Sequence, residues 1–139
     1  AEEVASFLNV NELILLKTNA FHLDTVFTTI IDQHGKLCAV VVCKDLISKD
    51  SFDLLYKFSD LNNIKIIKIP PIDSIGINNN IGSLAVNNFS APGLLISSSR
   101  FSEPFVAKYL NSKNIKMETT PVSQFQLSGG SIHCLTNEL

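Results

Sequence analysis

The sequence predicts an α/β fold in which short strands alternate with amphipathic helices. Runs rich in β-branched and aromatic residues are followed by segments with one apolar helical side, and the same order of elements occurs twice, at an offset of about 51 residues. The 139 residues, 45% of them hydrophobic, suit one domain with a buried core over 1–139.

Local patterns define the elements of the first half. Residues 1–8 favour a helix because good helix formers accompany acidic residues in the first turn. His34-Gly35 makes a turn between two apolar runs, which predicts a hairpin whose second strand is buried on both faces. The predicted elements, in order, are a helix over 1–8, strands over 12–17, 23–31 and 37–43, a helix over 48–60 capped by serine or aspartate, and a strand over 64–69.

The second half repeats this order after an asparagine-rich loop over 73–80. Residues 63–70 align without gaps with 114–121, at four identical positions. The predicted elements are strands over 83–86 and 94–97, a helix over 102–111 and a strand over 115–122. The sequence therefore predicts two strand–strand–helix–strand units, roughly 21–70 and 82–122, each too small to bury its apolar face without neighbours.

Charge and cysteine content exclude several classes of function. With 11 basic and 13 acidic residues the net charge is −2 and no basic run exists, so we expect no nucleic-acid partner. The longest apolar runs are far shorter than the ~20 residues that span a bilayer, so we expect no membrane partner. Cys38 and Cys43 lie in an apolar run, which favours free thiols in a reducing, cytoplasmic setting. The cysteine and histidine spacings match no zinc pattern, and we expect neither metal nor organic cofactor.

Two short stretches carry reactive side chains. Over 127–136, Gly129-Gly130 precedes Cys134 in a polar loop, which is either a nucleophile turn or a surface turn beside a small buried hydrophobe. His22 and Asp24 are two residues apart, so on a strand they point to the same face. A cysteine, a histidine and a carboxylate distant in sequence are the groups that a thiol nucleophile and its acid/base partner require.

These stretches resemble the guanidino-group-modifying enzymes of the pentein superfamily, which include arginine deiminase, dimethylarginine dimethylaminohydrolase, agmatine deiminase and the amidinotransferases. Their His-x-Asp strand resembles 21–27, their terminal Gly-Gly-x-x-His-Cys resembles 129–134, and their Asn-rich segment before a Pro-Gly turn resembles 79–93. The resemblance implies a five-module α/β propeller of ββαβ units, of which about two to three would be present. The family's Glu-Gly-Gly-like stretch and its early acidic residue have no counterpart, so the chain looks like the C-terminal part of such an enzyme.

The resemblance also implies a reaction. Cys134 would attack the guanidinium carbon of arginine or a derivative to give a thiouronium intermediate, and His22 would act as general acid and then base. Asp24 would hold a guanidinium nitrogen or orient His22, unless backbone amides satisfy it as a strand-end aspartate. Gly129 and Gly130 would bind substrate, and His133 would tune the thiol only if it faced Cys134. Whether the enzyme is a hydrolase or an amidinotransferase, and which guanidino compound it uses, stays open.

A non-catalytic binding or structural module with this fold is the alternative. Translation factors with a pentein-like fold lack the chemistry, and the presence of His22 and Cys134 argues against them. Because the chain resembles only the C-terminal part of such an enzyme, we expect the 139 residues alone to be inactive and to self-associate, through 12–42 or through the edge next to Ser83.

Overall fold

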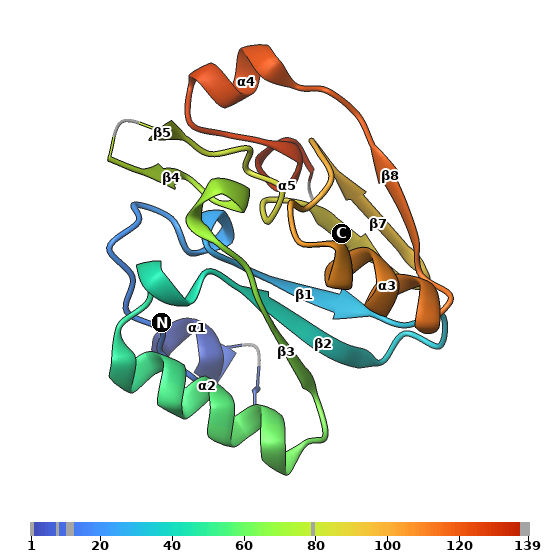
Figure 1. The fold of residues 1–139 in the computed structure, drawn as a ribbon. Helices are drawn as coiled ribbons and strands as arrows, with labels where there is room; N and C mark the ends of the chain where they lie inside the picture. Colours follow the sequence, from blue (N-terminus) through green and yellow to red (C-terminus); the bar gives the residue numbers. More distant parts are fainter. Residues whose placement is uncertain (1, 8, 11–12, 79, 137–139) are drawn as a thin grey trace.

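Two three-stranded sheets of identical topology form the body of the protein (Figure 1). The structure, a computed structural model, describes residues 2–7, 9–10, 13–78 and 80–136. In each sheet the first two strands are antiparallel, and the third strand, which follows a helix, joins the second in parallel. The predicted α/β class is therefore confirmed.

The first sheet contains the most deeply buried strand of the molecule. Its unit consists of β1 (Phe27–Ile31), β2 (Leu37–Val42), α2 (Lys49–Leu61) and β3 (Lys65–Lys68). Residues 39–42 of β2 are almost fully buried, because β2 is the central strand and is covered on both faces, as its continuous apolar run predicts. The backbone N–H of Ser51 donates to Ser48 Oγ at 3.3 Å, so the predicted serine cap begins α2.

The second sheet repeats the pattern with a shorter helix. Its unit consists of β6 (Phe89–Ala91), β7 (Leu94–Ser97), α3 (Pro104–Ser112) and β8 (Lys116–Thr119). From the helix C-terminus onward the offset of 51 holds, since Asn63 and Asn114 both end their helices at positive φ, 55° and 54°. At the helix N-terminus the offset of 51 does not hold, and the helix predicted over 102–111 begins two residues later than predicted. Helix α3 starts only at Pro104 and has 9 residues against 13 in α2, about one turn fewer.

The two sheets meet along their first strands. Thr28 Oγ1 donates to Asn88 Oδ1 at 3.0 Å, and the N–H of Ile31 donates to Ser90 Oγ at 3.2 Å. Tyr109 Oη adds a third link by donating to the carbonyl of Cys38 at 3.0 Å. One continuous core joins the two units, and its largest fully buried aliphatic side chains are Ile30, Ile67, Leu95, Leu110 and Ile115.

Shorter elements connect and flank the two units. They are α1 (Glu2–Phe7), η1 (Leu23–Thr25), η2 (Lys44–Leu46), η3 (Pro71–Asp73), β4 (Gly76–Ile77), β5 (Asn80–Ile81), α4 (Ser123–Leu127) and α5 (Ile132–Leu135). Helix α1 agrees with the helix predicted over 1–8, whereas the loop predicted over 73–80 contains the small β4–β5 hairpin. Among the described helices, none is long and apolar enough to cross a membrane.

The strand predicted over 12–17 is wrong where the structure describes it, because residues 13–17 belong to no sheet. The N–H of Lys17 donates to Ser51 Oγ at 2.8 Å, and its carbonyl accepts from the N–H of Ser48 at 2.9 Å. The segment therefore makes its backbone hydrogen bonds with the start of α2 instead of with a neighbouring strand. Residues 11 and 12 lie outside the described part.

Two further predicted strands are corrected at the edge where the sheets meet. The strand predicted over 23–31 begins only at Phe27, because Thr25 Oγ1 donates to the carbonyl of His22 at 2.6 Å and helps to close a 3₁₀ turn. The strand predicted over 83–86 is a turn, with Leu84 at φ 52° and its N–H donating to the carbonyl of Ser74 at 3.1 Å. Both turns carry residues of the candidate site.

Candidate active site

Cys134 lies in the short helix α5, not in the polar loop that the sequence predicts over 127–136. Helix α4 ends at Leu127, and Gly129 takes φ 83°, a left-handed conformation that lets the chain turn back toward α5. Ser131 and Ile132 are buried and fix the start of α5, while Cys134 is exposed. The chain thus presents the thiol at the surface from a helix whose first residues are anchored.

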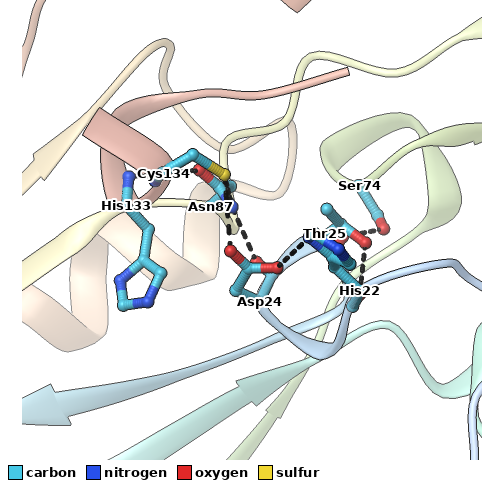
Figure 2. Close-up of polar contacts among 7 residues, drawn as sticks. All are labelled: His22, Asp24, Thr25, Ser74, Asn87, His133 and Cys134. Carbon is cyan, nitrogen blue, oxygen red and sulfur yellow. Dashed lines mark hydrogen bonds and ion pairs between the residues drawn. The ribbon is translucent and has the colours of Figure 1, made fainter. Parts of the chain in front are cut away.

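Asp24 joins the two predicted site segments. Cys134 Sγ donates to Asp24 Oδ2 at 3.4 Å, and His22 Nδ1 lies 3.9 Å from Asp24 Oδ1 (Figure 2). Asp24 Oδ1 is buried and accepts no hydrogen bond from the described residues. The predicted common strand face of His22 and Asp24 is wrong, because Asp24 is in η1, yet the turn still brings the two side chains together. Imidazole, carboxylate and thiol form a row in which the carboxylate is central.

His22 is the outermost member of this row. Its side chain is 61% exposed and stacks on Phe21, with ring centroids 4.3 Å apart. Phe21 in turn lies beside Gly129, where a Cβ would come within 3.6 Å of the Phe21 ring. His22 can therefore exchange protons with solvent and still reach a group held by Asp24.

Asn87 is a site residue that the sequence analysis did not single out. Its side chain is fully buried in the turn before β6. Nδ2 lies 3.4 Å from Cys134 Sγ and 3.3 Å from the carbonyl of Asp24, and Oδ1 accepts from the N–H of His133 at 3.1 Å. The available signal was a pair of asparagines directly after the apolar run 84–86, where polar side chains are costly unless they are hydrogen-bonded.

A pocket of about 300 Å³ opens beside Asp24. It is lined by Leu23, Asp24, Phe27, Thr28, Thr29, Val86, Asn88 and His133. Figure 2 shows the His133 ring turned away from the Cys134 sulfur, so the two neighbours point in different directions. His133 therefore faces whatever occupies this pocket rather than the thiol.

The other two cysteines differ from Cys134 in their surroundings. All three are free, as the sequence predicts, but Cys43 is buried and Cys38 is half-buried. Burial raises the pKa of the Cys43 thiol, helped by the negative charge of Asp45, and burial likewise raises the pKa of Cys38. At neutral pH both stay protonated, which makes them poor nucleophiles.

The chain is similar in structure to ArgZ, an arginine dihydrolase from the ornithine–ammonia cycle in cyanobacteria. Its N-terminal domain bound to product superimposes with a TM-score of 0.76 over 98% of this chain, at 19% sequence identity. The chain has the pentein fold. The predicted resemblance is thereby confirmed for the fold, although no protein-family model and no curated protein matches the sequence.

Two further pentein structures extend this comparison. The ArgZ N-terminal domain covalently bonded to a reaction intermediate gives a TM-score of 0.75, with 18% identity over 96% of this chain and 44% of that chain. AgrE in a ternary complex with ornithine and NAD⁺ gives 0.69, with 18% identity over 89% of this chain and 16% of that chain. The chain spans less than half the length of the pentein chains that it matches.

Proposed function

We propose that this pentein chain carries the nucleophile side of an active site for guanidino compounds. The supporting observation is that Cys134 Sγ lies 3.4 Å from the Asp24 carboxylate, although the two residues are 110 positions apart. A carboxylate beside a thiol suits a cationic planar substrate, because the guanidinium can pair with the carboxylate while its carbon faces the sulfur. The similar ArgZ structures contain substrate, product and a covalent reaction intermediate.

In the first proposed step the Cys134 thiolate forms a bond to the guanidinium carbon. A carbon–nitrogen bond then breaks, and the leaving nitrogen takes a proton from the His22 imidazolium and departs as ammonia or as an alkylamine. The bound cation favours the thiolate, because its positive charge offsets the charge of Asp24 next to the sulfur. The product of this step is a thiouronium on Cys134.

In the second step neutral His22 removes a proton from water as its oxygen attacks the thiouronium carbon. The carbon–sulfur bond then breaks, the remaining hydroxyl proton passes to solvent, and a ureido compound leaves as the Cys134 thiolate is restored. An amine in place of water would make the enzyme an amidinotransferase. Gly129 and Gly130 would contact the substrate, since a Cβ added at Gly129 would lie 3.6 Å from the Phe21 ring and one added at Gly130 would lie 3.8 Å from Cys134 Sγ. We propose that this reaction takes place in the cytoplasm, where free thiols persist.

Completion of the site requires more than these residues. A planar guanidinium offers hydrogen-bond donors in several directions, and Asp24 can accept only part of them. We therefore propose that a further protein part, either the other half of the pentein domain or a second copy, supplies the remaining carboxylates. The 139 residues alone should then turn over arginine poorly.

The alternative is a non-catalytic pentein module with a ligand-binding or structural role. Reaction with 2-chloroacetamidine, a guanidinium mimic that alkylates thiols, separates the two. A formed site predicts that peptide mapping finds Cys134 modified well before Cys38 and Cys43, and that arginine slows the labelling. Cys134→Ser should abolish the labelling and leave the circular dichroism spectrum unchanged. Labelling of Cys134 that arginine does not affect would favour the non-catalytic module, because burial alone already protects Cys38 and Cys43.

A further inference from the structure

We propose that Asn87 is a positioning residue that holds the Cys134 sulfur and donates an N–H to its anionic form. The inference deepens the proposed function, since it takes Cys134 as the nucleophile. Asn87 lies outside the His-x-Asp and Gly-Gly segments and contacts both, 63 residues from Asp24 and 47 from Cys134.

The amide of Asn87 has all its hydrogen-bonding positions filled. Nδ2 donates to the carbonyl of Asp24 at 3.3 Å and to Cys134 Sγ at 3.4 Å. Oδ1 accepts from the N–H of His133 at 3.1 Å and from the N–H of Cys134 at 3.5 Å. An amide offers two donors and two acceptor lone pairs, so these four contacts saturate it.

Only one orientation of the amide satisfies these partners. If the group were rotated by half a turn, its oxygen would face a carbonyl and a sulfur, and its nitrogen would face two N–H groups. The two N–H groups at the start of α5 therefore determine that the amide nitrogen faces Cys134. The donor to the sulfur is fixed by the fold before any substrate binds.

The turn that carries Asn87 is rigid as well as buried. The backbone N–H of Asn87 donates to the carbonyl of Leu84 at 3.0 Å, and its carbonyl accepts from the N–H of His133 at 3.4 Å. A fixed donor in a buried position stabilises a negative charge without rearrangement. Asn87 Nδ2 contacts the sulfur as a donor and Asp24 Oδ2 contacts it as an acceptor, so of the two only Asn87 can donate to an anionic sulfur.

Replacement of the donor with an acceptor of the same shape tests the proposal. Asn87→Asp keeps the oxygen that accepts from α5 but turns a carboxylate oxygen toward the sulfur. We expect alkylation of Cys134 by iodoacetamide to slow about tenfold at pH 7, with its half-maximal rate about one pH unit higher, because a like charge disfavours the thiolate. Asn88→Ala is the matched control: it removes from the same turn a buried amide that donates to the carbonyl of Ala85 and accepts from Thr28 Oγ1, with no contact to the sulfur.

If the rate of Cys134 alkylation depends on pH in the same way in wild type, Asn87→Asp and Asn88→Ala, the proposal is overturned. If Asn87→Asp fails to fold, the wild-type protein still decides: the ¹⁵N–¹H signals of the Asn87 side chain should shift over the same pH range in which Cys134 becomes reactive, and should not shift in Cys134→Ser. Signals that do not move with pH would contradict the proposal. The alkylation rate and the NMR signals both report on the Cys134 thiol and not on turnover. A protein that does not turn over guanidines would therefore contradict the proposed function but not this inference.

Discussion

At the scale of single residues, the site is ordered around a carboxylate. Asp24 contacts the thiol with one oxygen and lies near the imidazole with the other, and its second oxygen is buried without a hydrogen-bond donor among the described residues. A buried acceptor of this kind is costly unless a ligand satisfies it. Under the proposed function, the guanidinium of a substrate would supply the missing donor.

The exposed His22 is the predicted proton donor, and its removal should affect the rate of turnover more than the fold. In the complete protein, His22→Ala should lower the turnover of its guanidino substrate by ~10²-fold, the usual effect of losing a general acid. His133→Ala is the comparison, because that ring faces the pocket and not the sulfur. Steady-state kinetics of both variants would contradict the assignment if His133→Ala lost more activity than His22→Ala.

At the scale of elements, the two units end their helices in the same way. Asn63 and Asn114 both have left-handed backbone conformations. The N–H of the residue after each one donates to the carbonyl five residues earlier, at 2.8 Å in the first unit and 2.9 Å in the second. Asparagine tolerates this conformation and glycine adopts it freely, whereas alanine is strained there.

Substitutions at these matched positions should therefore have matched effects on stability. We expect Asn63→Ala and Asn114→Ala each to lower the free energy of unfolding by about 1 kcal/mol, the cost of a left-handed alanine. Asn63→Gly and Asn114→Gly should be close to neutral. Urea denaturation of the four variants measures this, and an alanine variant as stable as its glycine counterpart would show that the turn does not require positive φ.

The sequence predicts the elements whose pattern is local and misses those that distant contacts define. Strand β2 and helix α2 have continuous or amphipathic apolar patterns and a local serine cap, so their bounds are close to those predicted. The run 13–17 looks like a strand, but its backbone partners are on Ser48 and Ser51, which no local pattern reveals.

In the candidate site too, the sequence identifies residues that have a local motif and misses those that distant contacts define. Cys134 and Asp24 can be selected as candidates from their residue types and motif spacing. Asn87 cannot, because its role depends on hydrogen bonds to residues 47 and 63 positions away. The helical setting of Cys134 was missed for a related reason: α5 is four residues long and is held by Asn87 rather than by its own sequence.

At the scale of the whole molecule, we expect the link between the two units to weaken at alkaline pH. Burial raises the pKa of Tyr109 far above its ordinary value, and the neighbouring Cys38 adds to the effect. The folded-state pKa values of Tyr109, Cys38 and Cys43 are raised, so folding keeps these groups protonated. The stability that these groups contribute is fully present below their pKa values in the unfolded chain, which are about 8.5 for thiols and about 10 for tyrosine. It is lost as the pH rises above these values toward the folded-state ones.

Tyr109→Phe tests this alkaline dependence. The wild-type free energy of unfolding should fall between pH 8 and pH 11, and it should fall less in Tyr109→Phe, which has no phenol to ionise in the unfolded state. Tyr56→Phe is the matched control, since Tyr56 is the other tyrosine and is exposed. Equal pH slopes for the two variants, measured by urea denaturation, would show that Tyr109 does not link pH to stability.

The measurement that tests the central claim most directly is the mass of a trapped intermediate in the complete protein. His22→Ala lacks both the acid of the first step and the base of the second, so it should form the thiouronium on Cys134 slowly and hydrolyse it more slowly still. The intact mass should therefore rise during prolonged mixing with arginine. A gain equal to arginine less ammonia indicates a hydrolase that releases ammonia, and a gain of the amidino group alone indicates release of the alkylamine. Peptide mapping should place the adduct on Cys134, and His22→Ala/Cys134→Ser should show none. A folded His22→Ala protein that turns over arginine at the wild-type rate, or an adduct located on Cys38 or Cys43, would contradict the account.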